Sequence, residues 1–384
     1  MKKLLFIMKY PACIHENLKN KFDGQMNACV RLGYEVWYME WDGSSFYAVC
    51  KNTRKKEKLL SCKTIIGKER YYHTQYFMDM YRAGRRLLKK EAFQYVYMRN
   101  MPFFLSAVSM GKEIGKQTKF IIEIPTYPFE AEEKAEKQVL RKLAWRISNY
   151  FRKKIFSMAD MFTICGVPVQ GSVYGKPAMN VINGVEVETL PLRKPQLEKE
   201  KIHILLLASM CFWQAYDKMI ESLKEYEHKE DVILHFVGND GDGSLMEWKA
   251  SAKDKGLTGH IFFHGALYGQ PLDEMIDQAD IGIGTLGLYR KGSNEGATLK
   301  VREYMSRGLP FIYAGNDQAI TENLEFALQV PNDDTALDMK QIIEFAKKFK
   351  NADQIPGRMR EYAREHMSWD SEFEKILRKV GETE

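Results

Sequence analysis

The sequence lacks any apolar run long enough to cross a bilayer, which takes about 18 consecutive residues. Its longest candidates are Phe103–Gly111 and Ile204–Trp213. The N-terminus also lacks a secretory signal, because only Leu4–Met8 is apolar before Lys9, whereas a signal needs an apolar core of about 7–15 residues and a cleavage site. We therefore expect a cytoplasmic protein and neither an integral membrane protein nor a secreted one.

Cysteine is scarce and follows no pattern. The six cysteines, at positions 13, 29, 50, 62, 165 and 211, form no CxxC pair and no metal-ligand spacing. In a chain of this length such cysteines are typical of reduced thiols, so no disulfide framework is expected.

The chain contains enough apolar residues to form a hydrophobic core. Its 384 residues exceed the size at which one hydrophobic core keeps growing, so two domains are expected. With 45% hydrophobic and 28% charged residues, the composition is globular and far from that of disordered chains.

Charge is divided unevenly along the chain. Residues 1–190 carry 32 Lys and Arg against 18 Asp and Glu, a net charge of +14, whereas residues 191–384 carry 25 against 33, a net charge of −8. A basic first half indicates an anionic partner, for which a lipid surface, a nucleic acid and a phosphorylated acceptor are the candidates. A set of solvated lysines would give the same balance.

Strand-like and helix-like patterns alternate along both halves, which is typical of parallel α/β sheets. Strands are expected at residues 3–8, 34–40, 95–98, 119–124, 159–164, 202–208, 232–237 and 261–264, and helices at 24–32, 103–114, 130–156 and 217–226. The turn dipeptide Asn183-Gly184 marks a boundary. We expect a first domain over 1–180 and a second over 181–365. A charged helical stretch over 351–377 is expected to end in a C-terminal helix, 366–384, that returns to the first domain.

The most informative segment is 279–312. A buried strand, Asp280–Leu286, runs into the loop Gly287–Gly296 and then into a helix over Thr298–Arg307. In an open α/β sheet, ligands bind beyond the carboxyl ends of the strands, and a helix N-terminus offers free N–H groups to an anion. The segment therefore predicts a phosphate site.

Charged side chains at this loop fit a nucleotide sugar. Arg290, Lys291 and Lys300 bring three cations to it, which can oppose a diphosphate. The carboxylates of Glu295 and Glu303 can accept hydrogen bonds from sugar and ribose hydroxyls. An ordinary basic loop would explain the cations alone.

The residues Glu295-Gly296-Ala297-Thr298-Leu299-Lys300-Val301-Arg302-Glu303, followed by Tyr304-Met305 and Gly308-Leu309-Pro310, resemble the E-x7-E segment of GT-B glycosyltransferases. The segment is most similar to the family-4 (group 1) retaining glycosyltransferases of bacterial surface and capsular polysaccharide synthesis. Further similar segments are 181–185, 234–238, 262–265 and 279–280, and more loosely 123–128. The resemblance covers most of residues 180–330 and covers 1–180 only loosely.

The resemblance implies two Rossmann-like α/β domains facing across a cleft, and transfer of a hexose from a nucleotide diphosphate donor to a hydroxyl with retention. Glu295 would position the hexose, Glu303 would hold the ribose, and Arg290 and Lys300 would stabilise the leaving diphosphate. The remaining donor-binding residues that we expect are Lys291, Gly296, Ala297, Thr298, Leu299, Trp213, Tyr216 and Gly238. One departure from the family is that Ser209–Asp217 lacks the usual cations, which Arg290, Lys291 and Lys300 would replace.

The first domain is expected to bind the acceptor through residues at its strand ends. These residues are Gln25, Arg99, Glu123 and Tyr127, with Lys9, Asn100 and Thr126 as further candidates by position. Glu123 fits a general base or a hydroxyl ligand, and a carboxylate at a strand end fits a cap or an ion pair equally.

No metal cofactor is expected, because Asp240-Gly241-Asp242 follows the wrong strand for the metal site of other transferases. The expected partners are a nucleotide sugar and a glycan or lipid-linked glycan, but no nucleic acid. Residues 137–154 carry seven Lys and Arg and no acidic residue, which fits a helix on an anionic membrane, at the inner face of the cell membrane, and fits a packed helix with a solvated face as well.

Two other function classes stay open. A sugar-nucleotide 2-epimerase shares the fold and needs no acceptor. A non-catalytic protein that binds an anionic ligand, including nucleic acid, would use the basic half, although no nucleic-acid module is recognised. A nicotinamide dehydrogenase fits poorly, because the glycines from Gly238 to Gly243 are in the wrong order.

Overall fold

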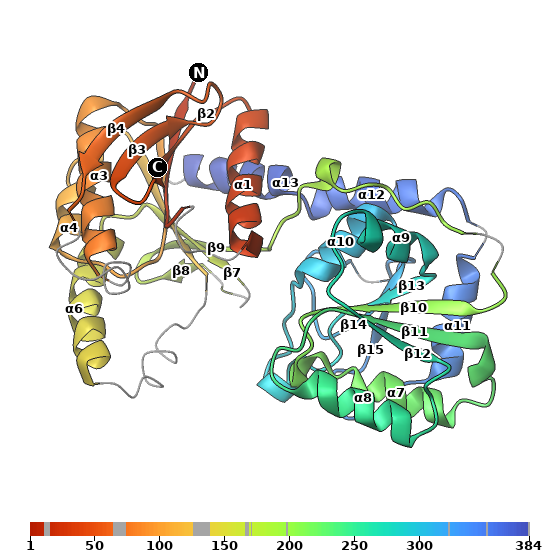
Figure 1. The fold of residues 1–384 in the computed structure, drawn as a ribbon. Helices are drawn as coiled ribbons and strands as arrows, with labels where there is room; N and C mark the ends of the chain where they lie inside the picture. Colours follow the sequence, from red (N-terminus) through yellow and green to blue (C-terminus); the bar gives the residue numbers. More distant parts are fainter. Residues whose placement is uncertain are drawn as a thin grey trace. The chain divides into compact units, whose positions relative to one another are not determined.

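The computed structural model describes residues 1–10, 16–63, 74–125, 139–165, 169, 171–196, 199–321, 323–350 and 352–382. The chain divides into unit 1, residues 1–182 and 369–384, and unit 2, residues 183–368 (Figure 1). It passes from one unit to the other after Ile182 and again after Ser368. The sequence analysis places these two limits at 180 and 365.

Unit 1 is built on one sheet whose centre is parallel. Its described strands lie in the order β4 (Lys56–Ser61), β3 (Ser45–Cys50), β2 (Glu35–Trp41), β1 (Lys3–Ile7), β5 (Tyr95–Arg99), β6 (Lys119–Ile124), β7 (Met161–Cys165), β9 (Lys176–Val181) and β8 (Ser172–Val173). From β2 to β9 the neighbours are parallel, as expected. The antiparallel strands β3, β4 and β8 at the two edges were not predicted.

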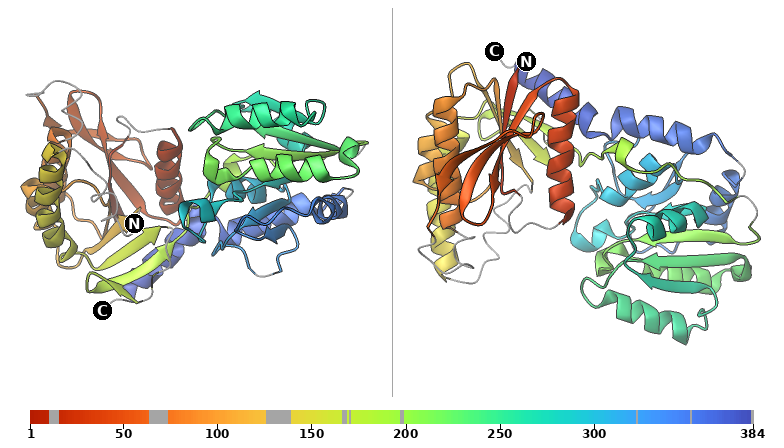
Figure 2. Two further views of the ribbon diagram at one scale, coloured as in Figure 1. Left: turned by 90° about the horizontal axis from the view of Figure 1, so that it is seen from below. Right: turned by 45° about the horizontal axis from the view of Figure 1, so that its top comes forward.

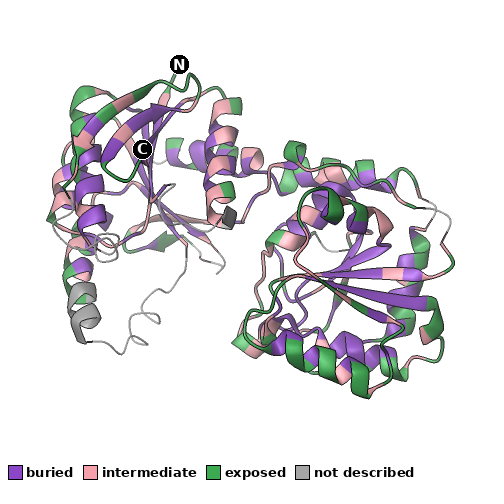
Figure 3. Ribbon diagram, viewed as in Figure 1, coloured by how far each residue is buried: buried purple, intermediate pink, exposed green. Residues whose placement is uncertain are grey.

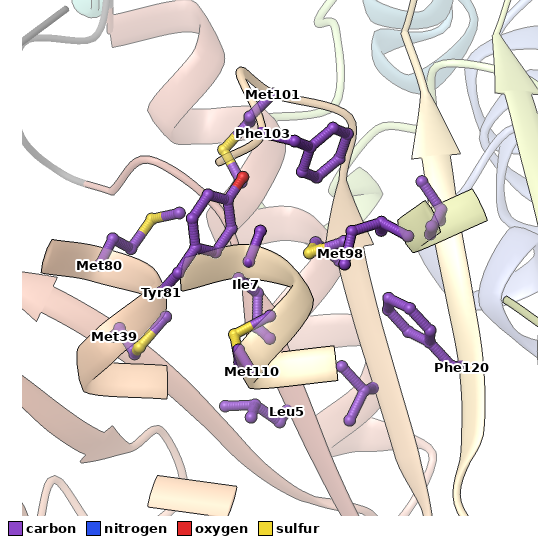
Figure 4. Packing of buried hydrophobic residues seen from close by; sticks show 14 of the residues in the cluster. Leu5, Ile7, Met39, Met80, Tyr81, Met98, Met101, Phe103, Met110 and Phe120 are labelled. Atoms are coloured by element: carbon purple, nitrogen blue, oxygen red, sulfur yellow. The ribbon is translucent and has the colours of Figure 1, made fainter. Parts of the chain in front are cut away.

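Helices cover both faces of this sheet. On one face α1 (Glu16–Arg31) packs beside α13 (Trp369–Gly381), and on the other lie α3 (Gln75–Lys90), α4 (Leu105–Gly111) and α6 (Val139–Phe156) (Figures 1 and 2). Figure 4 shows the core under α3 and α4, where Tyr81 of α3 points toward Met101 and Phe103. Full burial of an apolar side chain contributes about 1.5–3 kcal/mol, so this core holds the helices on the sheet.

The C-terminal stretch is two helices and not one. α12 (Ile355–His366) belongs to unit 2 and α13 to unit 1, because the chain changes units at Ser368. The apolar residues Trp369, Phe373, Ile376 and Leu377 are buried against unit 1. In the parts of the chain that the structure describes, no helix is long and apolar enough to cross a membrane.

Unit 2 has a wholly parallel sheet in its described part. The order is β12 (Ile261–Gly265), β11 (Val232–Val237), β10 (Ile202–Leu207), β13 (Ile281–Ile283), β14 (Phe311–Ala314) and β15 (Ala327–Val330). One face packs against α7 (Asp217–Glu225), α8 (Ser244–Asp254) and α11 (Met339–Lys348), and the other against α9 (Gln270–Gln278), α10 (Leu299–Arg307) and α12. The inner strands β10, β11, β13 and β14 are mostly buried, whereas the edge strands β12 and β15 are partly exposed (Figure 3). The predicted class, two Rossmann-like α/β units, is confirmed.

Three strands of unit 2 carry a row of histidines. His203 Nδ1 lies 2.8 Å from His235 Nε2, and His235 Nδ1 lies 3.0 Å from His264 Nε2. Burial lowers the pKa of all three, and that of His235 to about 3. The three rings are therefore neutral at pH 7, and protonating them opposes folding.

Candidate functional site

The centre of the predicted donor site is Lys300, in the first turn of α10. Its ammonium donates to Gln214 Oε1 at 2.5 Å and to the Tyr216 hydroxyl at 2.7 Å. Neither partner is charged, and in the described part of the chain no carboxylate pairs with this lysine. Burial holds the pKa of Lys300 well below its usual range. The Lys300 side chain is half-buried, and a sheltered cation without a counter-ion is costly, so this position favours the binding of an anion.

The start of α10 adds backbone donors at the same place. Thr298 is the N-cap residue, and its side chain makes no capping hydrogen bond. The first N–H groups of a helix have no partners within it and carry the positive end of its dipole. Together with Lys300 they are the groups on which the predicted anion site depends, next to the half-buried Ala297 and the exposed Leu299, and anion binding here stays a prediction.

Arg290 holds two loops together and does not point freely to a ligand. It lies in the short 3-10 helix Leu288–Lys291 and forms a bidentate pair with Asp217 at 2.7 and 2.8 Å. It also donates to the carbonyl of Phe212 at 2.9 Å. The carboxylate raises the pKa of Arg290. The guanidinium that was expected to face the diphosphate is thus paired with Asp217. Through this pair, Arg290 connects the loop after β13 to the start of α7.

Glu295 is held by the segment that follows β14. Its Oε1 accepts a hydrogen bond from Asn316 Nδ2 at 3.1 Å, and the N–H of Gly296 donates to the Asn316 carbonyl at 2.8 Å. A Cβ at position 296 would lie 2.6 Å from Leu288 Cδ1, so the packing favours glycine there. The carboxylate is half-buried and keeps capacity to accept hydroxyls.

Glu303 lies one turn further along α10, where Arg307 Nε donates to its Oε1 at 2.9 Å. Arg307 also pairs with Asp273 at 2.6 Å. A carboxylate shared with one arginine still has a second oxygen for a ribose hydroxyl, as the sequence analysis expects.

The two aromatic residues of the donor loop have different environments. Trp213 is half-buried, and the exposed Lys291 places its ammonium 4.4 Å from the Trp213 ring centre. Tyr216 is fully buried, with its ring against Phe236 and Trp248 in the core. Tyr216, expected among the donor-binding residues, therefore does not present its ring to a ligand: the ring faces the core, and the hydroxyl accepts a hydrogen bond from Lys300.

The turns after β11 have structural roles. Gly238 has a φ of +145°, and a Cβ there would lie 1.6 Å from the carbonyl oxygen of Ala208, so only glycine fits between the strand ends. Asp240 and Asp242 accept backbone and hydroxyl hydrogen bonds inside their own turn, and Asp242 also accepts from the N–H of Phe212 at 2.9 Å.

Unit 1 brings three of the four predicted acceptor residues together. The buried carboxylate of Glu123, at the end of β6, accepts from Gln25 Nε2 at 2.9 Å and from Arg99 at 2.5 Å. Lys21 at 3.1 Å and the Tyr97 hydroxyl at 2.8 Å complete its surroundings. These cations and donors lower the pKa of Glu123 to about 2 against the effect of burial. Glu123 is an ion-pair partner and no general base.

Other acceptor candidates are not brought into this cluster. Tyr127 and Thr126 lie outside the described residues. Lys9 places its ammonium 5.7 Å from the Tyr76 ring centre instead. The buried side-chain oxygen of Asn100 has no hydrogen-bond partner among the described residues.

Sequence reasoning missed the residues that support the predicted ones. Gln214 accepts from Lys300 and also from the Thr285 hydroxyl at 3.1 Å, and Asp217 and Asn316 hold Arg290 and Glu295. Their position just after strands β10 and β14 is the signal that could have found them, since ligands bind at such ends. In unit 1, Lys21 and Tyr97 carried no comparable pattern.

Comparison with known proteins finds a family match within unit 2. Residues 201–347 match the family model of glycosyl transferases group 1. No curated protein matches the sequence.

Solved structures share the whole fold at low identity. A glycosyltransferase from Rickettsia africae covers 100% of this chain and 98% of its own, with a TM-score of 0.62 and 14% identity. The catalytic domain of starch synthase IV from Arabidopsis thaliana, bound to ADP and acarbose, covers 99% and 98%, with a TM-score of 0.61 and 11% identity. HepE from Anabaena, in complex with UDP, covers 99% and 100%, with a TM-score of 0.56 and 11% identity. These similarities show the GT-B fold.

Proposed function

We propose that this chain, a GT-B glycosyltransferase whose second unit belongs to the glycosyl transferases group 1, moves a hexose from a nucleotide diphosphate sugar to a hydroxyl of a glycan or lipid-linked glycan. Transfer with retention in surface polysaccharide synthesis is part of the proposal. The observation that carries it is the half-buried ammonium of Lys300 at the start of α10, which has no carboxylate partner among the described residues.

The reaction breaks the bond between the anomeric carbon and the diphosphate oxygen and forms one to the acceptor oxygen on the same face. Negative charge grows on the departing diphosphate, and Lys300 with the N–H groups of α10 lies ready to stabilise it. Glu295, fixed by Asn316, would orient the hexose hydroxyls, and Glu303 would hold the ribose. The acceptor proton leaves with the diphosphate or with solvent.

No metal is part of this proposal. Asp240 and Asp242 form an Asp-x-Asp pair. Their carboxylates already accept hydrogen bonds from their own turn, and that of Asp242 also accepts one from the Phe212 N–H. Lys300 can supply the positive charge that a divalent cation would otherwise bring. Transfer should therefore persist in a chelator, and a complete loss of activity restored only by a divalent cation would contradict this part.

The first test is thermal-shift screening of UDP, GDP, ADP and CMP and their common sugars. A ligand that binds the native state raises its melting temperature. We expect one nucleotide to do so, with the shift lost in Lys300→Met and reduced in Glu303→Ala and Arg290→Ala. The matched control is Lys224→Met, which removes an exposed lysine of α7.

Product analysis then separates transfer from its alternatives. Incubation with the donor that binds should give a glycoside only when an acceptor is present. Release or epimerisation of the sugar without acceptor would favour the 2-epimerase, and no response to any nucleotide would favour a non-catalytic binding protein.

A membrane-bound acceptor would fit one surface of unit 1. Leu105 of α4 and Ile147 and Tyr150 of α6 are exposed, and Lys154 lies 4.5 Å from the Tyr150 ring centre. Apolar side chains beside basic ones favour anionic lipid. Sedimentation with anionic vesicles should decrease in Ile147→Glu and at high salt, and absent or salt-insensitive binding would contradict this partner.

A further inference from the structure

The buried carboxylate of Glu123 lies where unit 1 would meet a ligand. Glu123 and Arg99 end neighbouring parallel strands, β6 and β5, and Tyr97 belongs to β5. Lys21 and Gln25 reach the same carboxylate from α1. The carboxyl ends of parallel strands are where α/β sheets bind ligands.

Charge in this cluster does not balance. Lys21 and Arg99 both pair with Glu123, and their side chains are only 11% and 19% exposed. The nearby Asp23 is occupied by another lysine at 2.5 Å. The Cys165 thiol adds no negative charge, because burial raises its pKa to about 11. Two sheltered cations thus share one described carboxylate, which leaves a surplus of one positive charge.

Hydrogen-bond capacity is also in surplus. Glu123 already accepts four donors on its two oxygens, so it needs no further cation. An arginine offers five N–H donors and a lysine three, yet among the described residues Arg99 donates only to Glu123, and Lys21 to Glu123 and weakly to Cys165. Spare donors on a fixed guanidinium match the oxygens of a carboxylate or phosphate.

The residue that follows Arg99 in the chain carries a buried acceptor. Asn100 follows Arg99 at the end of β5, and its side-chain oxygen has no partner in the described part of the chain. A carbonyl oxygen in that state is satisfied by a hydroxyl donor. The strand end thus offers cations for an anion and an acceptor for a hydroxyl.

We propose that the cluster Lys21–Arg99–Glu123 binds an anionic group, a carboxylate or a phosphate, that belongs to the acceptor sugar. The assignment of that anion to an acceptor rests on the proposed transfer reaction, whereas anion binding at the cluster does not. The acceptor is then a uronic acid or a phosphorylated or phosphate-linked sugar and not a neutral glycan.

Binding can be followed through Trp369, because Lys21 places its ammonium 5.7 Å from that ring. The chain carries Trp213→Phe to remove the fluorescence of the donor loop, and is titrated separately with inorganic phosphate and with glucuronate. We expect saturable fluorescence changes whose Kd rises at least tenfold in Lys21→Gln and in Arg99→Gln. Lys3→Gln, which removes a cation at the opposite end of the sheet, is the matched control and should bind as the parent does. Whichever of the two anions binds more tightly shows whether the site prefers a phosphate or a carboxylate.

Glu123→Gln gives a test of opposite sign. This change leaves both cations without their carboxylate, so anion affinity should increase at least threefold and the lowered melting temperature should recover when the anion is added. A purely structural ion cluster predicts lower stability without recovery. Absence of saturable binding in the parent and in Glu123→Gln, or equal Kd values in Lys21→Gln and the parent, would overturn the proposal.

Activity separates this inference from the proposed function, because the titrations contain no nucleotide. If the anion binds but no sugar is transferred from any donor, the proposed transferase function is refuted and the anion-binding site is supported. If neutral and anionic acceptors are used with equal kcat/KM, the chain is a transferase, but the bound anion does not belong to the acceptor. We expect kcat/KM for the anionic acceptor to be at least tenfold higher, with that preference lost in Arg99→Gln.

Discussion

Replacing Lys300 by methionine should leave unit 2 at least as stable and make its donor site weaker. The ammonium donates to Gln214 and Tyr216 and has no carboxylate partner in the described residues. Gln214 Oε1 would keep the Thr285 hydroxyl as a donor, and the Tyr216 hydroxyl would keep the Ile283 carbonyl as an acceptor at 3.1 Å. The substitution therefore strands no buried polar group.

The magnitude follows from two opposing contributions. Keeping an ammonium out of water costs several kcal/mol, and its two hydrogen bonds to neutral groups return about 1.5–3 kcal/mol each. Methionine fills a similar volume without that penalty. Because these contributions are of similar size, we expect the free energy of unfolding of Lys300→Met to equal that of the parent or to exceed it by up to about 2 kcal/mol at pH 7.

The pH dependence gives an independent check of sign. The pKa of Lys300 is lower in the folded chain than in the unfolded one. Between those two values the unfolded chain binds more protons, so the stability of the parent increases with pH. The stability advantage of Lys300→Met should therefore shrink as the pH rises toward the usual pKa of a lysine.

Urea denaturation at pH 7 and 9, with isothermal titration of the nucleotide found by screening, measures both effects. The Kd of the nucleotide should rise at least tenfold in Lys300→Met, about 1.4 kcal/mol. The exposed Lys224→Met should change stability by less than about 0.5 kcal/mol. A Lys300→Met chain that is less stable than the parent by more than about 1 kcal/mol, or that binds nucleotide unchanged, would refute the reasoning.

Three further outcomes test other parts of unit 2. Asp317→Ala leaves the fully buried Arg302 unpaired, so urea denaturation should show a loss of about 3–5 kcal/mol, and a loss below 1 kcal/mol would contradict the pair's importance. Gly238→Ala puts a Cβ against the Ala208 carbonyl, so near-ultraviolet circular dichroism should show no folded unit 2; a native spectrum would count against the close approach. The pKa of His235 falls from 6.5 to about 3 on folding, so stability should decrease as pH falls below 6.5, by about 2 kcal/mol at pH 5, and His235→Phe should flatten that slope; an equal slope in both chains would exclude this histidine as the cause.

Local patterns determined the central parallel strands of both sheets and the order of elements at the donor site, whereas helices such as α3, α8, α9 and α11 were not predicted. The apolar run of β11 occupies the predicted residues Val232–Val237, and α10 begins one residue after the predicted Thr298. Such elements depend on periodicity and on turn residues that lie close together in the chain. The antiparallel edges of unit 1 escaped prediction because β3 and β4 are defined by pairing, which the short range of the pattern does not contain.

The chemical state of the site residues was decided by tertiary structure. The sequence presents Arg290 and Lys300 as equivalent cations, yet folding pairs the first with Asp217 and leaves the second against Gln214 and Tyr216. The aromatic ring of Tyr216 is of the kind that can bind a base or a sugar, but in the folded chain it is fully buried in the core. Glu123 became an ion-pair partner when α1 brought Lys21 to it across 102 positions of sequence. Sequence determines which groups are available at a strand end, whereas burial and partners, which come from distant segments, set the charge and the free donors that each group presents to a ligand.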